Sequence, residues 1–269
     1  MDLDSLGFNF RDGIYYSNKL KPISYPDEGN DICYQVEDDS FWFNHRNNCI
    51  AHLVKLYSRH SDFWDVGGGN GIVSKRLQEE GFDTVMIEPG IKGALNAKNR
   101  GVEYIICGIL EDVEFNQFMG NVGLFDVVEH IEDDLGFLKS IKLKMRDGAH
   151  LFVTVPAYQL LWSNEDVDAG HYRRYTGKSM SKLMEKAGYK VIFSTYLFWP
   201  LPIPIFLKRT LTSLLSSKNI SKDSTENEHR TTGIMNRIVI KLLEKEFLRI
   251  KNGTKVVFGS SCLIVGKTF

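Results

Sequence analysis

The stretch Phe63-Trp64-Asp65-Val66-Gly67-Gly68-Gly69-Asn70-Gly71 decides the fold of this chain of 269 residues. Its apolar first half is typical of a short buried strand, and the chain then breaks into glycines. Residues 72–80 carry a helical pattern, and residues 84–87 form a second apolar strand that ends on one carboxylate, Glu88. Strand, glycine turn, helix, strand and terminal acid together predict a βαβ unit, and therefore a parallel sheet.

A βαβ unit with these features typically binds an adenosine compound at its turn. Glycine has no Cβ, so the turn lets the backbone come close to a ligand. Glu88, which Pro89 follows, suits a ribose because an ionised carboxylate only accepts hydrogen bonds and a cis-diol offers two donors. A glycine turn without a ligand is the plainer alternative, and the acid at the expected strand end argues against it.

The spacing of the glycines indicates which adenosine compound is expected. A dinucleotide site has the pattern G-x-G-x-x-G. The third glycine position of that pattern is Ile72 when counted from Gly67, and Ser74 when counted from Gly69. The stretch instead fits D-x-G-x-G-x-G, whose defined positions are Asp65, Gly67, Gly69 and Gly71. This run resembles the first motif of the class I S-adenosylmethionine-dependent methyltransferases.

The resemblance implies S-adenosyl-L-methionine as the cofactor and S-adenosyl-L-homocysteine as its product. The methionine end of this cofactor carries an ammonium, and the molecule has no pyrophosphate. The carboxylate of Asp65 would attract the ammonium, whereas it would repel a pyrophosphate. The turn and strand-end residues expected to hold the cofactor are Asp65, Gly67, Gly68, Gly69, Asn70, Gly71, Glu88 and Pro89.

The third strand is expected at residues 103–108, and its end adds further cofactor contacts. In many relatives an acid after the last glycine of this strand, here Gly108, contacts the adenine amino group. This sequence has Ile109 at that position. The backbone of Ile109 or Leu110, or the side chain of Asp112, is expected to take over the contact.

The fourth strand is expected at residues 121–125, and the pattern D-V-x-E-H-x-x-D follows it. This pattern resembles the segment after the same strand in the methyltransferase family. Because ligands bind beyond the carboxyl ends of parallel strands, Phe125 and Asp126 are expected to face the methyl group. Glu129 and His130 open the next helix, where Glu129 is expected to contact the acceptor.

A helix is expected at residues 41–58, starting after the acids Asp38 and Asp39. In class I methyltransferases a leading helix of this kind often covers the cofactor. By that resemblance, Trp42 belongs to an aromatic wall for the sulfonium, and Arg46 meets the methionine carboxylate. The alternative is that the aromatic residues belong to the core and Arg46 is a surface charge.

The fifth strand is expected at residues 149–156, and the loop after it is expected to bind the acceptor. Loops at this edge of a sheet carry substrate contacts, and the polar cluster at residues 170–176 has no hydrophobic period. The combination L-x-S-x-x-D…G-H-x-R-R-Y-T also recurs in a bacterial subgroup of these methyltransferases. The acceptor-binding residues expected in this loop are Trp162, Tyr172, Arg173 and Arg174.

The two arginines of the loop have two interpretations. Arginine suits an anionic acceptor, such as a carboxylate or a phosphate. Alternatively, Arg173 or Arg174 caps a nearby helix or pairs with Asp166 or Asp168. At least one of the two is expected to be structural.

A sixth strand is expected at residues 189–197, with a closing strand at 255–265 that lies antiparallel beside it. The predicted fold is α/β: a three-layer Rossmann-like sandwich with a seven-stranded, mostly parallel sheet and an antiparallel last strand. The chain is expected to comprise an N-terminal arm with a cofactor-covering helix (1–60), the Rossmann-like core (61–197 plus 255–269) and an insertion (198–254).

The insertion at residues 198–254 is rich in basic side chains and starts with alternating prolines. Residues 233–251 predict an amphipathic helix. Its apolar side is expected to carry Ile234, Ile238 and Leu242 together with Met235, Val239 and Leu243. A lid over an apolar acceptor, a dimer face and a membrane-surface contact all fit this composition. The plainer alternative is an ordinary packed helical pair, and the sequence does not decide the oligomeric state.

Composition bounds the remaining classes. The chain is long enough for one full core, and its net charge of −1 argues against a nucleic-acid partner. Residues 1–10 lack the pattern of a signal peptide. Four widely spaced cysteines predict reduced thiols rather than disulfides or a zinc site, and no metal is assigned. The expected location is cytoplasmic, with peripheral contact at the inner membrane surface as an alternative.

The expected function is transfer of a methyl group from S-adenosylmethionine to O, N or C of a small-molecule, glycan or lipid-linked acceptor, by direct in-line displacement. His130 and His171 are the candidate general bases for an acceptor that must lose a proton. One alternative is a non-catalytic S-adenosylmethionine-binding module or partner protein. Another is an NAD(P)-dependent oxidoreductase, against which the glycine spacing and the lack of a Tyr-x-x-x-Lys pair after the fourth strand argue.

Overall fold

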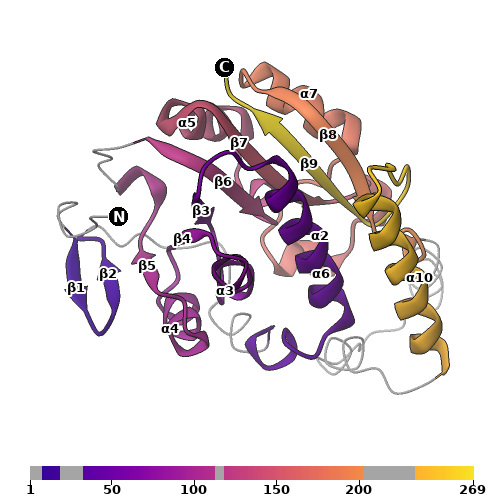
Figure 1. The fold of residues 1–269 in the computed structure, drawn as a ribbon, viewed down its shortest axis with the longest axis horizontal. Helices are drawn as coiled ribbons and strands as arrows, with labels where there is room; N and C mark the ends of the chain where they lie inside the picture. Colours follow the sequence, from indigo (N-terminus) through magenta and orange to yellow (C-terminus); the bar gives the residue numbers. More distant parts are fainter. Residues whose placement is uncertain (1–7, 19–32, 113–117, 203–233) are drawn as a thin grey trace.

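The computed structural model of the protein describes residues 8–18, 33–112, 118–202 and 234–269 (Figure 1). The strands are β1 (Asn9–Arg11), β2 (Ile14–Tyr16), β3 (Asp62–Val66), β4 (Asp83–Glu88), β5 (Tyr104–Cys107), β6 (Met119–Phe125), β7 (Met145–Pro156), β8 (Lys190–Leu197) and β9 (Ser261–Lys267). The helices are α2 (Phe41–Tyr57), α3 (Ile72–Glu79), α4 (Ile91–Arg100), α5 (Asp134–Lys144), α6 (Asn164–Asp168), α7 (Gly177–Lys186) and α10 (Ile234–Lys251), with short 3₁₀ turns η2 (Leu110–Asp112), η3 (Val128–His130) and η4 (Gln159–Leu161).

Within these ranges the strands form one nine-stranded sheet in the order β1-β2-β5-β4-β3-β6-β7-β9-β8. The five strands from β3 to β7 pair in parallel, and β9 lies antiparallel between β7 and β8. The α/β class, the mostly parallel sheet and the reversed last strand are therefore confirmed. The last strand begins at Ser261, later in the chain than the sequence predicted.

The sheet has nine strands instead of seven because an N-terminal hairpin extends it. β1 and β2 pair antiparallel, and β2 then pairs in parallel with β5. Ile14 is fully buried beside Ile105, so this hairpin continues the hydrophobic core. The expectation of an irregular arm was wrong for these residues: the edge of β5 offers unpaired backbone groups, which a short strand satisfies. The remainder of the expected arm, 1–7 and 19–32, lies outside the described residues.

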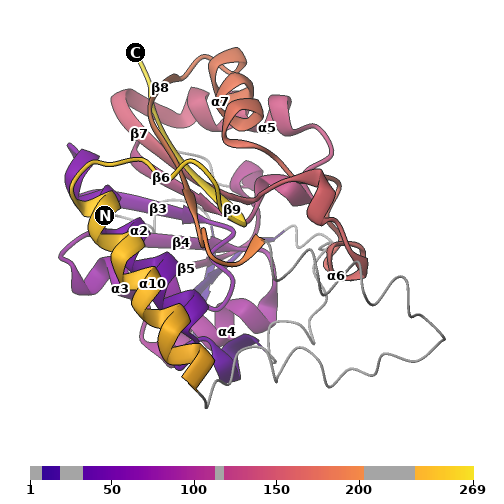
Figure 2. The ribbon, with the colours of Figure 1, turned by 90° about the vertical axis from the view of Figure 1, so that its right-hand side faces the viewer.

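Helices cover both faces of the sheet, so the molecule has three layers (Figures 1 and 2). On one face α5 and α7 bury their apolar side chains against β6 and β7. On the other face α2, α3 and α10 pack against the phenylalanine-rich side of β3 and β7, while α4 packs beside β4 and β5. Alternation along each strand sends successive side chains to opposite layers, which explains why the central strands are apolar throughout.

The helix predicted at 41–58 is α2, whose first turn is capped by the side chain of Ser40. The helix predicted in the insertion is α10, and it packs directly on α2. The packed helical pair expected within the insertion stays a prediction, because residues 203–233 lie outside the described part of the chain. One detail of the predicted stripe was wrong: Leu243 is buried, but Ile238 is 47% exposed.

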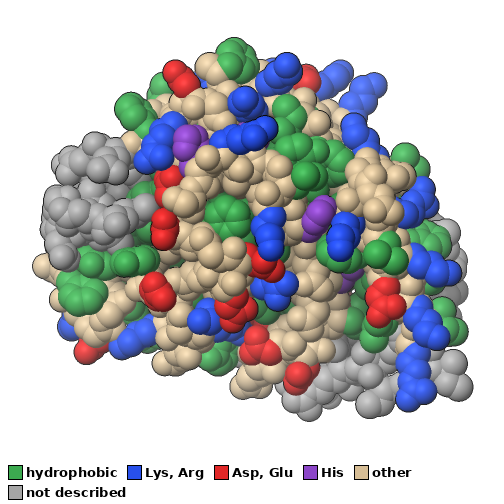
Figure 3. Space-filling view, in the orientation of Figure 1, with side chains coloured by type: hydrophobic (Ala, Val, Ile, Leu, Met, Phe, Trp, Pro, Cys, Tyr) green, Lys and Arg blue, Asp and Glu red, His purple; other side chains and the backbone are tan. Residues whose placement is uncertain are grey.

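The outward face of α10 is basic. Its exposed cations are Arg237, Lys241, Lys245, Arg249 and Lys251, and blue side chains follow this helix in Figure 3. Among the described helices, none combines the length and the apolar character that crossing a bilayer requires.

A buried carboxylate attaches α10 to the rest of the molecule. Glu246 is fully buried, and its side chain accepts hydrogen bonds from the backbone N–H groups of Phe198 and Trp199, both at 2.7 Å. It also pairs with Nε2 of His45 on α2 at 2.6 Å. Three donors from two distant segments therefore converge on one side chain of α10.

Replacing Glu246 with alanine is predicted to lower the free energy of unfolding by about 3–5 kcal/mol, because three buried donors lose their acceptor. Urea denaturation followed by tryptophan fluorescence measures this change. Glu244→Ala, on the exposed side of the same helix, serves as the control and is expected to change the value by no more than about 0.5 kcal/mol. Equal effects of the two variants would contradict the prediction.

Candidate cofactor and acceptor site

The carboxyl ends of β3, β4, β5, β6 and β7 meet at one edge of the sheet, where ligands bind in folds of this type. β3 and β4 pair so that Val66 lies opposite Ile87, and the N–H of Gly67 donates to the carbonyl of Ile87 at 2.8 Å. Glu88 therefore lies next to the glycine turn. The two stretches that sequence analysis assigned to one ligand do come together.

The glycines of the turn have different roles. A Cβ on Gly68 would lie 2.6 Å from Cγ of Met86, and a Cβ on Gly71 would lie 2.7 Å from Cβ of Ala97, so packing alone requires glycine at both positions. Gly69 has φ +55°, and a Cβ there would meet no atom within 4 Å. The open side of the turn is therefore at Gly69, where a ligand can approach the backbone.

Asp65 lies beneath the turn with 1% of its surface exposed. The hydroxyl of Ser74, on α3, donates to Oδ2 at 2.6 Å, while Oδ1 has no hydrogen-bond partner among the described residues. Burial raises the pKa of Asp65 to about 6, although the Ser74 hydrogen bond and the charge of Arg46 oppose this. A buried oxygen without a donor is costly, so this carboxylate fits a ligand that brings a positive donor such as an ammonium.

The side chain of Glu88 links the glycine turn to the start of α4. Its Oε2 accepts from the N–H of Gly69 at 2.8 Å, and its Oε1 accepts from the N–H of Gly90 at 2.7 Å. A carboxylate has about four acceptor positions, so these two bonds alone do not exclude contacts to the two hydroxyls of a ribose. Ribose binding by Glu88 is therefore compatible with its geometry. The sequence did not predict its second role, which is to accept hydrogen bonds from the backbone of Gly69 and Gly90.

Asn70 was expected to contact the cofactor, but its side chain is engaged in the protein. The amide donates to Oε1 of Glu37 at 3.2 Å and accepts from Nδ2 of Asn96 at 3.0 Å. Arg100 donates to the carbonyl of Asn70 at 3.2 Å and pairs with Glu37 at 2.8 Å. This network attaches the turn to α4, so Asn70 positions the turn.

A cavity of about 430 Å³ opens where β3, β4 and β5 end. It is lined by Val66, Gly67, Ile87, Pro89, Gly108, Ile109, Leu110, Glu111, Val127, Ile131, Asp133, Gly136, Phe137 and Ser140. Predicted cofactor residues thus share this wall with side chains of α5 and of the segment after β6. The lining residues from α5 and from the segment after β6 were not predicted, because an apolar residue that lines a pocket has the same sequence pattern as one in the core.

The residues around the cavity indicate which of the three predicted adenine contacts the structure favours. Oδ2 of Asp112 accepts from the hydroxyl of Ser17 at 2.8 Å, which ties β2 to the end of β5. The side chain of Asp112 is thus used to position the hairpin. Ile109 and Leu110 line the cavity directly, so their apolar surface and backbone groups are the features that this wall offers to a base.

Arg46 and Asp126, predicted separately, form an ion pair. Arg46 is buried, so its interpretation as a surface charge was wrong. Asp126 has φ +58°, and its Oδ1 accepts from the hydroxyl of Thr154 on β7 at 3.0 Å. Positive φ in a residue other than glycine is strained and is common at functional sites. The pair links the covering helix α2 to the ends of β6 and β7.

The aromatic residues near this ion pair belong largely to the core. The indole of Trp42 stacks on Phe198, with centroids 3.6 Å apart and planes 6° apart. The ring of Phe125 is buried and parallel to that of Phe63 at 6.3 Å. Because this ring is buried, a contact of Phe125 with the methyl group would come from its backbone, and the contact stays a prediction.

Glu129, His130 and His171 form a cluster beside the ends of β6 and β7. The imidazole rings of His130 and His171 lie 4.6 Å apart at 81°. Burial, followed by the charge of His171, lowers the pKa of His130 to about 4, so its ring is neutral at pH 7. Burial, followed by the charge of Asp126, raises the pKa of Glu129 well above its ordinary value.

Both arginines of the acceptor loop are paired. Nε and Nη2 of Arg174 donate to the two oxygens of Asp166 at 2.7 and 3.0 Å. Arg173 pairs with Asp134 at 2.9 Å and donates to the carbonyl of Glu132 at 2.8 Å. The structural interpretation thus holds for Arg174, which pairs with Asp166 as the alternative proposed, whereas Arg173 pairs with a different carboxylate, Asp134. Binding of an anionic acceptor by these guanidinium groups stays a prediction.

The other predicted acceptor residues lie at the surface of the same loop. Tyr172 is 51% exposed, and its backbone N–H donates to the carbonyl of Glu129 at 2.8 Å. Trp162, at the start of α6, is partly buried. The loop after β7 therefore lies against η3, which brings the predicted acceptor residues together.

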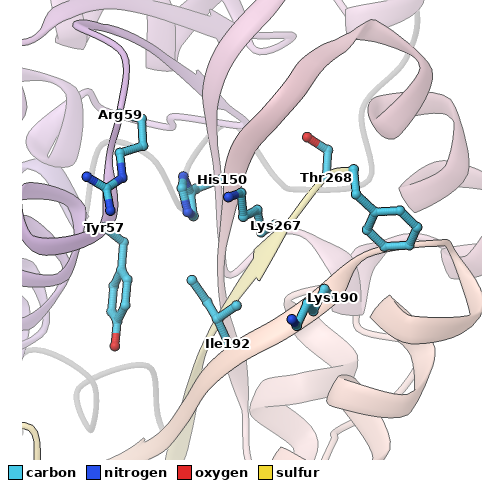
Figure 4. A pocket seen from close by; sticks show the side chains of 8 residues that line it. Tyr57, Arg59, His150, Lys190, Ile192, Lys267 and Thr268 are labelled. Atoms are coloured by element: carbon cyan, nitrogen blue, oxygen red, sulfur yellow. The ribbon is translucent and has the colours of Figure 1, made fainter.

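A second cavity of about 430 Å³ lies at the opposite edge of the sheet (Figure 4). Arg59, Lys190 and Lys267 give it a basic lining around His150. His150 is near the start of the parallel pairing of β7, away from the glycine turn. Burial, with the charges of Lys267 and Arg59, lowers the pKa of His150 to about 4. This cavity is not at the edge where ligands bind in folds of this type.

The parallel sheet with one reversed strand, the glycine turn over a buried acid and the acid at the end of the next strand define a class I S-adenosylmethionine-dependent methyltransferase. Residues 43–193 match the family described as a methyltransferase domain, and the chain belongs to that family. Its cofactor is S-adenosylmethionine. No curated protein matches the sequence closely enough to be compared.

Solved structures share the fold at low sequence identity. A chain of the Haloferax volcanii complex between the Trm112 methyltransferase activator and a proposed methyltransferase has 14% identity and a TM-score of 0.56, covering 90% of this chain and 95% of that one. A methyltransferase of Thermotoga maritima has 16% identity and a TM-score of 0.54, with the same coverage. Phosphoethanolamine N-methyltransferase 2 of Haemonchus contortus has 14% and 0.55, covering 91% of this chain and 58% of that one.

Asp65→Asn is predicted to weaken S-adenosylhomocysteine binding about 10- to 100-fold, because a charged hydrogen bond contributes about 1.5–3 kcal/mol. The amide retains an acceptor for Ser74, so the turn is expected to stay folded. Isothermal titration calorimetry measures the affinity. Asp83→Asn, at the exposed start of β4, is the matched control, and an unchanged affinity of the Asp65 variant would show that this carboxylate does not hold the ligand.

The affinity for S-adenosylhomocysteine is also predicted to depend on pH through Asp65. Its pKa is raised to about 6 in the protein without ligand, so the carboxyl becomes protonated as pH falls below about 6 and can no longer pair with an ammonium. Affinity should therefore decrease from pH 7 to pH 5 in the wild type. The Asp65→Asn variant should lack this decrease, and parallel curves for the two proteins would assign the dependence to another group.

Proposed function

We propose that this methyltransferase modifies a small-molecule or lipid-linked acceptor that binds between η3 and the loop after β7. The observation that carries the proposal is the Arg46–Asp126 ion pair, which joins the cofactor side of the site to the acceptor side at the ends of β6 and β7. Arg46 lies on the covering helix, and Asp126 precedes the Glu129–His130 segment. Cofactor and acceptor residues thus share one strand edge.

The chain's own residues would hold the cofactor in three places. The unpartnered Oδ1 of Asp65 suits the ammonium, Glu88 suits the ribose hydroxyls, and the cavity beside Ile109 suits the adenine. S-adenosylmethionine supplies a methyl group on a sulfonium, which is a good electrophile. The protein's contribution is then mostly positioning, with the acceptor atom held in line at about 3 Å from the methyl carbon.

An apolar rim around the acceptor side supports an acceptor with an apolar body. Leu160, Val167 and Tyr172 are large apolar or aromatic residues that lie exposed on the loop after β7. Such residues around a polar cluster are typical of a binding surface. Transfer to a glycan has no comparable support, because both arginines and Asp166 are already paired with one another or with nearby groups.

His171 is the better placed of the two candidate bases. Its Nδ1 lies 2.9 Å from Oδ1 of Asp166. Burial would raise the pKa of Asp166, but hydrogen bonds from His171 and Arg174 outweigh it and hold the pKa below its ordinary value. An ionised Asp166 favours the Nδ1–H tautomer, so Nε2 keeps a lone pair that can accept a proton. The ring of His130 packs against this imidazole and orients it.

Thermal unfolding separates the proposal from its alternatives. At 100 times their dissociation constants, S-adenosylmethionine and S-adenosylhomocysteine should each contribute about 2.7 kcal/mol and raise the Tm by about 5–10 °C, whereas NAD should have no effect. Stabilisation by NAD alone would overturn the assignment. Radiolabelled S-adenosylmethionine with a set of aromatic and lipid-linked alcohols and amines tests turnover. Binding without turnover on any acceptor would favour the non-catalytic module.

A further inference from the structure

Glu129 carries a buried carboxylate for which the described part of the chain offers no partner. Only 1% of its surface is exposed, and neither Oε1 nor Oε2 has a hydrogen-bond partner there. Burying an unpaired ionised carboxylate costs several kcal/mol, so such groups are normally paired, bound to a metal ion or held in the protonated form. The side chain follows directly after β6, at the acceptor end of the site.

Two histidines lie within reach of this carboxylate. Glu129, His130 and His171 each offer one ligand atom, and these atoms all lie within 4.8 Å of one another. Zinc bonds of about 2.0–2.2 Å place tetrahedral ligand atoms roughly 3.4 Å apart, so a side-chain shift of about 1 Å closes the cluster on an ion. Two imidazoles and one carboxylate are a ligand set that divalent transition metals favour.

The residues behind the cluster have the arrangement that metal-binding histidines require. Oδ1 of Asp166 lies 2.9 Å from Nδ1 of His171, which turns Nε2 away from Asp166. Asp166 is itself held by Arg174 and by the N–H of Ser163 at 2.8 Å. A carboxylate behind a histidine fixes the tautomer and the orientation of the ring, and it raises the basicity of the ligand nitrogen.

The charges around the cluster also favour a cation. Asp126 is paired with Arg46, and Asp166 is paired with Arg174. These two pairs engage the guanidinium groups of Arg46 and Arg174, and the described part of the chain provides no ion pair for the carboxylate of Glu129. A divalent cation supplies a matching charge where the structure provides three ligand atoms.

We propose that Glu129, His130 and His171 bind one divalent transition-metal ion, such as Zn²⁺ or Mn²⁺, at the acceptor end of the site. Three protein ligands leave a coordination position open. The open coordination position could hold an oxygen or nitrogen atom of the acceptor, and this role rests on the proposed methyl transfer. In that case the two histidines act as metal ligands and not as general bases. The binding of the ion does not depend on that function.

The test is metal binding by the full-length protein after removal of metals with a chelator. Isothermal titration with Zn²⁺ alone, and separately with Mn²⁺ alone, should show one equivalent bound by the wild type. Glu129→Gln keeps the side-chain shape without the charge, and this variant should lose the site, as should His171→Ala. Asp166→Asn should weaken binding about 10- to 100-fold. Mg²⁺, which prefers oxygen ligands, should bind much more weakly.

His60→Ala is the matched control, because His60 is partly buried outside the cluster. It should bind the metal as the wild type does. Wild-type affinity no higher than that of Glu129→Gln, or an equal loss in His60→Ala, would overturn the proposal. Circular dichroism verifies that each variant folds. If Glu129→Gln does not fold, metal binding by His171→Ala is the test instead. Titration of S-adenosylhomocysteine into Glu129→Gln separates the two proposals. A variant that still binds the cofactor but no longer binds metal supports the metal site. A wild type that binds the cofactor but no metal refutes the metal site and leaves the proposed function standing.

Discussion

The carboxylate of Asp65, buried at the end of β3, is the constraint around which the site is built. The hydroxyl of Ser74 on α3 holds one oxygen, so the strand and the following helix are joined across the turn. The turn between them has little space: a Cβ on Gly68 would come within 3.1 Å of the same carboxylate. The glycines are therefore required first by the protein's own packing, and the open side at Gly69 is what remains for a ligand.

Paired charges then assemble the acceptor side. The Arg46–Asp126 pair attaches α2 to β6, and the Arg174–Asp166 pair attaches the loop after β7 to α6. Buried pairs of this kind contribute little net stability, because desolvation offsets their attraction. Their effect is to hold side chains of different elements in one geometry, which is what a reaction that depends on positioning requires.

The C-terminal part of the chain supports the same arrangement from outside. Glu246 on α10 holds the backbone at Phe198 and the imidazole of His45, and Phe198 in turn stacks on Trp42. The position of α2, and with it of Arg46, therefore depends on a helix about two hundred residues further along the chain. An insertion whose role the sequence left open thus stabilises α2, the helix that carries Arg46.

Patterns within short windows were sufficient for much of the fold. The βαβ unit, the succession of the core strands along the chain and the bounds of α2 follow from periodicity, glycine positions and caps, all of which act between neighbouring residues. The hairpin of β1 and β2 could not be predicted in this way, because its strands have three residues each and gain their stability from the edge of β5. The burial of Ile238 on α10 was also mispredicted, since an apolar pattern by itself does not fix the rotation of a helix against its partner.

By itself the sequence determined the class of protein, because the D-x-G-x-G-x-G turn and the acid of Glu88 state the chemistry of the cofactor within 24 residues. Apart from the pairing of Arg174 with Asp166, which the sequence offered as an alternative, only the tertiary structure decided which charges are paired. Arg46 pairs with Asp126 and Arg173 with Asp134, and neither pair was predicted. Glu129 lies beside two histidines and has no hydrogen-bond partner for its carboxylate within the described part of the chain. Pairing depends on distances between segments that are far apart in the chain, and no local pattern contains those distances.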